Sequence, residues 1–253
     1  MRYALITGAT SGIGYEIAKL FINAGWGVVL VSSSGEHLSG AHERLLKIRK
    51  DCRIITITQD LSERGAAEQL YQAVRSIGID IDALVNDAGF GIIGAADNIP
   101  SDMEEKMMTL NMITPVQLCK AFIRDMYSRR SGMILNVAST GAFEPGPYNG
   151  SYYATKAFIY SYSRALAYEA REHGVKVCTL CPGTTRTGFF TRAGVKTPFI
   201  GMSPERVARA AFNGLMKGRE VVIPGAFNFL GRFAPEAVKM HCVAKVKKPR
   251  GGK

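Results

Sequence analysis

The sequence predicts an α/β fold: one parallel β-sheet of about seven strands, doubly wound and covered by helices on both faces. Three observations lead to this prediction. Short apolar segments alternate with helical segments along the chain. The apolar segments lack regular polar alternation, which is typical of strands buried on both faces. Repeated strand–helix units of this kind form parallel sheets through right-handed crossovers.

The predicted strands are apolar and rich in β-branched residues. In chain order they are YALIT (3–7), GVVLVSS (27–33), CRIITITQD (52–60), DALVNDAG (82–89), GMILNVAS (132–139), VKVCTLCPG (175–183) and EVVIPG (220–225). The segments between them space their apolar residues as helices do, at 12–25, 36–50, 63–78, 101–129, 152–174 and 204–218. No linker interrupts residues 1–225, so we expect one domain there and an extension at 226–253.

Composition is that of a globular protein with a substantial core: 47% of the 253 residues are hydrophobic and 21% are charged. No apolar run reaches the roughly 18 residues of a membrane-spanning helix, and the N-terminus enters a strand pattern at once. These features predict a cytoplasmic protein without a signal peptide. The pair Cys178 and Cys181 lies three residues apart in a predicted strand, facing opposite sides. We therefore interpret it as structural and expect no metal site.

The C-terminal extension is basic. The net charge is +11, and residues 239–253 contain six Lys/Arg and no acid. Apolar residues recur close to helical spacing at 229, 230, 233, 237, 240 and 244, which predicts an amphipathic basic extension. We expect it to pack against the domain or a second subunit. Weak contact with a membrane surface is an alternative, and nucleic acid is not an expected partner.

A glycine-rich loop follows the first predicted strand directly. In TGATSGIG (7–14), Gly8, Gly12 and Gly14 let the backbone turn tightly and approach a ligand, while Thr10, Ser11 and Ile13 complete the loop. The helix that follows presents free N–H groups and its positive dipole end. Between a first strand and its helix, this loop predicts a dinucleotide site.

A second motif, NGSYYATKAF (149–158), leaves its chemistry open when taken alone. Tyr152 lies four residues before Lys156 and Tyr153 lies three before it, so either phenol shares a helix face with the ammonium.

Together these motifs resemble the short-chain dehydrogenase/reductase family, with 3-oxoacyl reductases and hydroxysteroid dehydrogenases as similar members. The family marks occur in order over residues 1–225: Gly8-xxx-Gly12-x-Gly14, Asp60-Leu61, NDAG (86–89), Asn111, Ser139, Tyr152, Lys156 and PGTTRT (182–187). Ser139 lies 13 residues before Tyr152, which selects Tyr152 over Tyr153 as the family tyrosine. The resemblance implies a Rossmann-like fold and NAD(P)(H)-dependent interconversion of a ketone and a secondary alcohol.

The resemblance also implies roles for individual residues. The expected catalytic residues are Asn111, Ser139, Tyr152 and Lys156. Those expected at the cofactor are Gly8, Thr10, Ser11, Gly12, Ile13, Gly14, Ser32, Ser33, Asp60, Leu61, Asn86, Ala88, Gly89, Tyr152, Lys156, Pro182, Gly183, Thr185 and Thr187. The chain departs from the family pattern at Asp87, where a second asparagine is usual; this puts local bracing of the strands in doubt.

The chemistry of ketone reduction fits these residue types. Hydride goes to carbon while oxygen gains a proton, so a positioned acid is needed. The Lys156 ammonium can stabilise a Tyr152 phenolate and lower the pKa of that tyrosine. The Ser139 hydroxyl can hydrogen-bond the substrate oxygen. A non-catalytic NADP-binding regulator or scaffold of the same fold is the alternative.

The end of the second strand bears on cofactor choice. An acidic residue there would bind the ribose hydroxyls of NAD, but this chain has Ser32, Ser33 and Ser34. The arginine of many NADP-preferring relatives is missing, and His37 or Arg44 can compensate. We therefore favour NADP(H) over NAD(H).

Residues 184–203 correspond to the family's mobile substrate lid, with glycines at 188, 194 and 201. Aromatic residues here and in neighbouring loops are candidates for an apolar substrate pocket with Ser139: Phe90, Phe143, Tyr148, Phe189, Phe190 and Phe199. They favour an apolar carbonyl substrate such as a 3-oxoacyl or steroid-like compound. The family resemblance further implies a homodimer or homotetramer that pairs the helices near 105–128 and 152–172.

Overall fold

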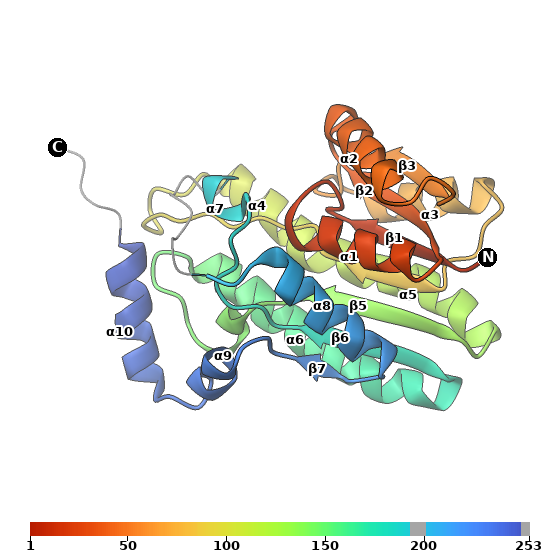
Figure 1. The fold of residues 1–253 in the computed structure, drawn as a ribbon. Coiled ribbons are helices and arrows are strands. Elements are labelled where there is room, and N and C mark those ends of the chain that lie inside the picture. Colours follow the sequence, from red (N-terminus) through yellow and green to blue (C-terminus); the bar gives the residue numbers. More distant parts are fainter. Residues whose placement is uncertain (193–200, 249–253) are drawn as a thin grey trace.

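The computed structural model describes residues 1–192 and 201–248, and it confirms the predicted parallel sheet (Figure 1). The described strands form one seven-stranded sheet in the order β3-β2-β1-β4-β5-β6-β7, and all neighbours pair in parallel. They are β1 (Tyr3–Thr7), β2 (Gly27–Ser32), β3 (Ile54–Thr58), β4 (Ala83–Asn86), β5 (Gly132–Val137), β6 (Val175–Leu180) and β7 (Val221–Val222).

The helices follow the predicted alternation. They are α1 (Gly12–Asn23), α2 (Gly35–Ile48), α3 (Ala66–Ser76), α4 (Ser101–Met108), α5 (Thr114–Ser128), α6 (Gly150–Ala170), α7 (Phe189–Arg192), α8 (Pro204–Met216), α9 (Ala226–Gly231) and α10 (Glu236–Lys247). Two 3₁₀ turns, η2 (Thr140–Phe143) and η3 (Arg171–His173), follow β5 and α6.

The helix predicted at 101–129 contains a π-helical turn, η1 (Thr109–Ile113), between α4 and α5. Pro115 has no N–H, so it cannot donate an α-helical hydrogen bond to the carbonyl of residue 111. The Thr114 N–H instead donates to the carbonyl of Thr109, five residues back. This turn holds Asn111, a predicted catalytic residue.

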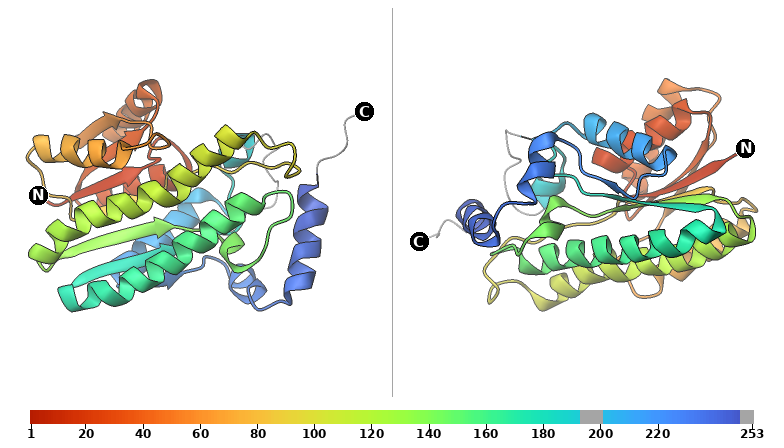
Figure 2. Two further views of the ribbon diagram at one scale, coloured as in Figure 1. Left: turned by 180° about the vertical axis from the view of Figure 1, so that it is seen from behind. Right: turned by 90° about the horizontal axis from the view of Figure 1, so that it is seen from below.

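The sheet lies between two helical layers (Figure 2). Strand side chains alternate between the layers: Ile6 packs in the cluster formed with α1, α2 and α8, whereas Leu5 packs in the cluster formed with α3, α5 and α6. The same alternation separates the two cysteines of the CxxC pair. Cys178 lies in the first of these clusters and Cys181 in a third cluster with Ile159 of α6, which confirms that they face opposite sides.

The last crossover departs from the expected handedness. The connections from β4 to β5 and from β5 to β6 run through α5 and α6, which lie on the same face of the sheet. The connection from β6 to β7 moves in the same direction along the sheet, but its helix, α8, lies on the opposite face. The β6–α8–β7 unit therefore has the opposite hand to the units before it. The face that α8 covers also carries α1 and α2, which connect β1 to β2 and β2 to β3. Helix α8 buries Leu135 of β5 and Cys178 of β6 on this face.

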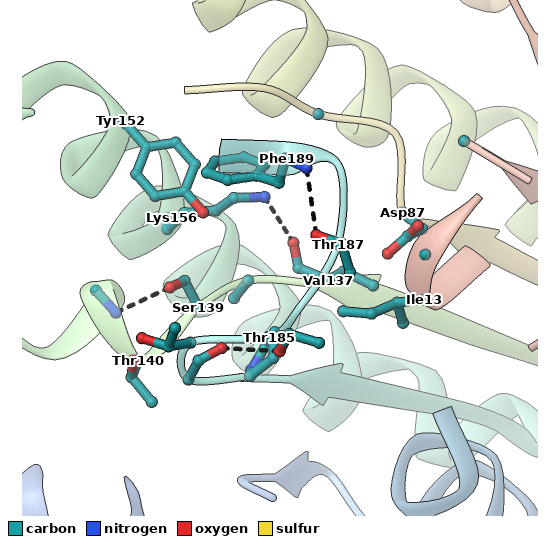
Figure 3. A pocket seen from close by; sticks show the side chains of 18 of the residues that line it. Ile13, Asp87, Val137, Ser139, Thr140, Tyr152, Lys156, Thr185, Thr187 and Phe189 are labelled. Atoms are coloured by element: carbon teal, nitrogen blue, oxygen red, sulfur yellow. Dashed lines mark hydrogen bonds between the residues drawn. The ribbon is translucent and has the colours of Figure 1, made fainter. Parts of the chain in front are cut away.

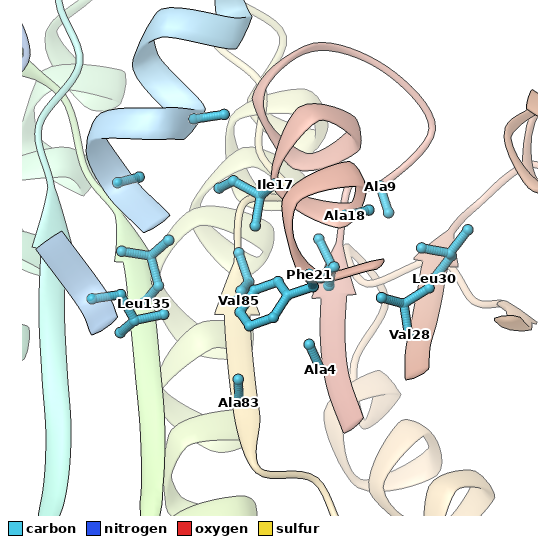
Figure 4. Packing of buried hydrophobic residues seen from close by; sticks show 14 of the residues in the cluster. Ala4, Ala9, Ile17, Ala18, Phe21, Val28, Leu30, Ala83, Val85 and Leu135 are labelled. Carbon is cyan, nitrogen blue, oxygen red and sulfur yellow. The ribbon is translucent and has the colours of Figure 1, made fainter. Parts of the chain in front are cut away.

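The core on the α8 side centres on Phe21, which is fully buried (Figure 4). Its ring centroid lies 5.1 Å from that of Trp26 and 5.1 Å from that of Phe212 of α8. This aromatic group joins α1, which begins at the glycine-rich loop, to α8. It therefore holds the loop's helix in place.

Within residues 226–248, the C-terminal extension contains two short helices and not one continuous helix. The chain forms α9 and then α10, with Pro235 as the N-cap of α10. Proline disfavours helical geometry in the preceding residue and has no N–H for the previous turn. The apolar spacing seen from residue 229 to residue 244 is therefore divided between two short helices.

No helix within residues 1–192 and 201–248 is both long and apolar enough to cross a membrane.

Phe21→Ala is expected to lower the free energy of unfolding by about 3–5 kcal/mol, because it leaves a cavity between α1 and α8. Urea unfolding monitored by circular dichroism measures this loss. Phe227→Ala is the matched control, since Phe227 is 93% exposed and its truncation is expected to change stability by no more than about 0.5 kcal/mol. Equal losses in both variants would contradict the packing argument.

Candidate functional site

The candidate site lies at the carboxyl ends of the strands, where strand order reverses between β1 and β4. A pocket opens there between the loops after β1, β4, β5 and β6 (Figure 3). Its lining includes the predicted residues Gly8, Ser11, Gly12, Ile13, Ala88, Gly89, Ser139, Tyr152, Lys156, Pro182, Gly183, Thr185, Thr187 and Phe189. Five loops and helices far apart in the sequence therefore meet at one cavity.

The glycine-rich loop has the backbone geometry of a close ligand cradle. Gly8 and Gly12 adopt φ values of +68° and +61°, in the left-handed region that favours glycine. A Cβ on Gly8 would lie 3.0 Å from the backbone of Ala88. The N-cap of α1, Ser11, makes no side-chain capping hydrogen bond, and the first turn contains no acidic residue. This helix N-terminus fits an anionic phosphate group.

Thr7 fastens the loop after β4 to the end of β1. Its Oγ1 accepts hydrogen bonds from the backbone N–H groups of Asp87 (3.1 Å) and Ala88 (3.0 Å) and donates to the carbonyl of Val85 at 3.4 Å. A Cβ on Gly14 would come within 2.7 Å of Asp87 Oδ2. The absence of a side chain at Gly14 therefore lets the Asp87 carboxylate lie against α1. The departure from the family asparagine is thus accommodated.

Ser139 caps the turn η2 with its side chain. The Gly141 N–H donates to Ser139 Oγ at 3.0 Å (Figure 3). Because this bond occupies an acceptor position of the hydroxyl, the O–H of Ser139 can donate to another oxygen in the pocket.

Tyr152 faces the pocket from the first turns of α6, beside Phe189 of α7. The two ring centroids are 5.4 Å apart. Burial raises the pKa of the Tyr152 phenol, and hydrogen bonding with Ser139 opposes that rise. A phenol with a raised pKa is protonated at neutral pH and can act as an acid.

Lys156 is buried one turn further along α6. Its Nζ donates to the carbonyl of Val137 at 2.9 Å and lies 5.7 Å from the ring centroid of Tyr152. Burial lowers the pKa of Lys156 to about 8, and the carboxylate of Asp87 opposes this effect. The expected lowering of the Tyr152 pKa is not the net result here, because burial of the phenol outweighs the hydrogen bond with Ser139.

Asn111 lies behind the pocket wall. Its Nδ2 donates to the carbonyl of Phe90 (2.9 Å) and to Thr155 Oγ1 (3.1 Å), and its Oδ1 accepts from the Phe90 N–H at 3.3 Å. A Cβ on Gly89 would meet Asn111 Oδ1 at 2.8 Å and Lys156 Nζ at 3.6 Å. Asn111 thus ties the loop after β4 to α6 next to Lys156.

Comparison with known proteins agrees with this geometry. A family model described as short chain dehydrogenase matches residues 2–196. The 3-ketodihydrosphingosine reductase of Bacteroides thetaiotaomicron is 34% identical over 73% of this chain and 64% of its own length. Dehydrogenase/reductase SDR family member 7B of Bos taurus is 28% identical over 98% of this chain and 82% of its own.

The chain belongs to the short chain dehydrogenase family. It is an oxidoreductase that acts on alcohol or carbonyl groups. Its fold is also similar to a short-chain dehydrogenase from Sphingobium yanoikuyae in complex with NADPH, with a TM-score of 0.85 and 26% identity over 100% of this chain and 99% of that one. The glycine cradle and uncapped helix described above fit such a nicotinamide dinucleotide.

Several predicted residues of this dehydrogenase lie outside the pocket lining: Thr10, Gly14, Ser32, Ser33, Asp60, Leu61, Asn86, Phe90, Asn111, Phe143 and Tyr148. Asn86 is buried, and its Nδ2 donates to Asn136 Oδ1 at 2.8 Å. Asp60 Oδ1 accepts from the N–H and hydroxyl of Ser62 in a local turn. Phe143 packs edge-on against Tyr160, with centroids 5.0 Å apart, rather than at the pocket.

Other pocket residues were not predicted as site residues from the sequence. Tyr153 lines the pocket while its ring packs over Gly141 and Gly146. Lys247 reaches the pocket from α10. The position of Tyr153 directly after Tyr152 in the sequence could have indicated that it lines the pocket. No local motif distinguishes Lys247 from the other lysines of the C-terminal extension.

The predicted lid is described at its two ends. Residues 185 and 202 form a parallel bridge, in which the Arg186 N–H donates to the carbonyl of Met202 and the Met202 N–H donates to that of Thr184, both at 2.9 Å. The predicted Gly194 and Phe199 lie outside the described residues, as does the side chain of Phe190.

Gly8→Ala in this dehydrogenase is expected to weaken NADPH binding at least about tenfold, because the new Cβ presses on the Ala88 backbone and the loop must leave its left-handed geometry. Titration of NADPH fluorescence measures the affinity. Gly78→Ala is the matched control, since Gly78 also has positive φ (+74°) but no atom within 4 Å of its Cβ position. Equal weakening in both variants would mean that backbone strain, and not the cradle, governs binding.

Proposed function

We propose that this dehydrogenase interconverts an apolar ketone and a secondary alcohol with NADP(H). The supporting observation is that Ser139, Tyr152 and Lys156 line one pocket with the glycine-rich loop. A non-catalytic NADP-binding scaffold has no chemical need for these three side chains at one cavity. In the reaction, bound nicotinamide supplies the hydride to the carbonyl carbon or accepts it from the alcohol.

Proton transfer to the carbonyl oxygen is assigned to Tyr152. Its raised pKa keeps the phenol protonated, so the O–H bond can break toward the substrate oxygen as that oxygen gains negative charge. The Ser139 hydroxyl, oriented by the Gly141 N–H, donates to the same oxygen. The ketone thus becomes an alcohol, and Tyr152 becomes a phenolate.

Lys156 stabilises this phenolate with its positive charge and binds the ribose next to the nicotinamide. Because the pKa of Lys156 is lowered to about 8, the ammonium form predominates below that pH. Asn111 acts as a positioning residue: its hydrogen bonds to Phe90 and Thr155 hold the loop after β4 against α6.

NADP(H) is preferred over NAD(H) in this proposal. The strand β2 ends at Ser32, where NAD-dependent relatives have a carboxylate. Arg44 of α2 reaches back to the glycine-rich loop: its Nη2 donates to the carbonyl of Thr10 at 3.0 Å, and its guanidinium lies 4.9 Å from the ring centroid of Tyr15. A guanidinium held at the glycine-rich loop suits the 2′-phosphate of NADP.

An apolar substrate is supported by the aromatic side of the pocket, where Phe189 and Tyr153 flank Tyr152. The name of the Bacteroides relative specifies a 3-ketodihydrosphingosine substrate, which agrees with this class. Both 3-oxoacyl and steroid-like ketones belong to the proposed substrate class.

A homo-oligomer that pairs α5 and α6 is part of the proposal. The rings of Phe158 and Tyr162 stack on α6 with centroids 6.4 Å apart, and Phe158 and Tyr168 are exposed on the same helix. Such an apolar helix face suits a second subunit.

Tyr152→Phe is expected to reduce kcat for ketone reduction by about 10²–10⁴-fold, since the proton donor is lost, and to change NADPH affinity far less than kcat. Stopped-flow oxidation of NADPH with a panel of apolar ketones measures the rate. Tyr153→Phe is the matched control, because it removes a neighbouring hydroxyl and keeps the ring over Gly141; its kcat should stay close to that of the original protein. Full activity in Tyr152→Phe would overturn the mechanism. NADPH binding without turnover on any ketone would favour the scaffold alternative.

Arg44→Ala is expected to raise the Kd for NADPH about tenfold, the effect of losing one charge-assisted hydrogen bond, and to leave the Kd for NADH unchanged. Fluorescence titration with each cofactor measures both constants. Lys47→Ala removes one positive charge from the same helix, further from the loop, and should change neither. An equal effect of Arg44→Ala on NADH would contradict the 2′-phosphate contact.

A further inference from the structure

Several large apolar side chains in α9 and just after it are exposed to solvent. Phe227 is 93% exposed, Leu230 63% and Phe233 68%, and Phe229 is also exposed. We call these four residues the α9 apolar cluster. The ring centroids of Phe229 and Phe233 lie 6.0 Å apart, and several large apolar side chains exposed on one short segment mark an interaction surface.

Cationic side chains accompany the cluster. The Arg232 guanidinium lies 4.4 Å from the ring centroid of Phe229 and 4.5 Å from that of Phe233. Residues 226–248 contain five Lys/Arg and one acidic residue, Glu236. Aromatic side chains beside basic ones are the combination that binds the headgroup region of an anionic bilayer.

This basic, aromatic surface adjoins the pocket mouth. Helices α9 and α10 lie at the end of the molecule to which the carboxyl ends of the strands point (Figure 1). Lys239 Nζ of α10 donates to the carbonyl of Phe143 in η2 at 2.7 Å, and η2 begins directly after Ser139. Lys247, at the other end of α10, lines the pocket itself. Whatever contacts α9 and α10 therefore lies close to the site entrance.

A second copy of the chain suits this surface poorly. A two-fold contact through α9 would bring the same basic patch against itself, and like charges placed opposite one another repel. An anionic lipid surface neutralises the charge and accepts the exposed rings at the same time. Lipid is therefore the occupant that charge complementarity favours.

We propose that α9 and α10 form a docking surface for anionic membranes, which inserts the α9 apolar cluster among the lipids and sets the pocket mouth at the bilayer surface. Docking itself does not depend on turnover. Its functional consequence, that an apolar ketone enters from the membrane, rests on the proposed function. Partitioning of such a ketone into lipid would then concentrate it at the entrance.

The test is co-sedimentation of the full chain with phosphatidylcholine vesicles that contain phosphatidylserine, and with phosphatidylcholine vesicles alone. We expect binding to the anionic vesicles, weakened by added salt. The variant Phe227→Ser/Leu230→Ser/Phe233→Ser should reduce that binding at least about tenfold, because three large apolar side chains no longer enter the lipid.

The matched control is Ile48→Ser/Ile77→Ser, which removes exposed apolar side chains (43% and 42% exposed) at helix ends remote from α9 and should bind vesicles as the original chain does. For every variant, thermal unfolding checks the fold, NADPH titration checks the cofactor site, and light scattering gives the oligomeric mass. Failure of the original chain to bind anionic vesicles would overturn the proposal, as would undiminished binding by the triple variant.

Two further outcomes separate the proposals. A lower oligomeric mass in the triple variant would identify the α9 surface as a subunit interface and overturn membrane docking. NADPH binding without vesicle binding overturns docking alone. Vesicle binding without NADPH binding overturns the proposed function and leaves docking supported.

Discussion

The reversal of strand order between β1 and β4 is the constraint on which the rest of the structure depends. The chain leaves β1 toward β2 and returns across the sheet to β4, so the loops after these strands diverge and leave a crevice. Thr7 fixes the width of this crevice, because its hydroxyl accepts hydrogen bonds from the backbone N–H groups of Asp87 and Ala88. The glycine-rich loop on one side and Gly89 on the other then lie at fixed separation, as a dinucleotide requires.

Buried polar contacts connect that crevice to the residues proposed for catalysis. The π-turn around Asn111 turns an amide toward Phe90 and Thr155, which joins the loop after β4 to α6. Lys156 on the same helix is held by the carbonyl of Val137 in β5, two residues before Ser139. Backbone groups of residues 137 and 141 thus hold the side chains of Lys156 and Ser139, which keeps both in place relative to the glycine-rich loop.

Burial gives these side chains complementary proton affinities. It raises the pKa of Tyr152 and lowers that of Lys156, because in both cases desolvation disfavours the charged form. The result is a protonated Tyr152 phenol near a Lys156 ammonium whose pKa is lowered. This arrangement suits proton delivery to a carbonyl oxygen. The C-terminal helices contribute a further charge at the same cavity through Lys247, which connects the exposed basic surface to the chemistry.

The sequence by itself determined the parallel sheet, the glycine-rich loop and many of the residues that line the candidate site, since apolar periodicity and motif spacing can be recognised in the sequence without the fold. Tertiary structure alone decided the opposite hand of the β6–α8–β7 crossover, the π-turn at Asn111 and the division of the extension into α9 and α10. It also decided that Phe143 packs against Tyr160 while Tyr153 and Lys247 line the pocket. The reason is physical: which face a side chain presents, and what covers it, depends on contacts between residues distant in sequence, and local patterns do not encode those contacts.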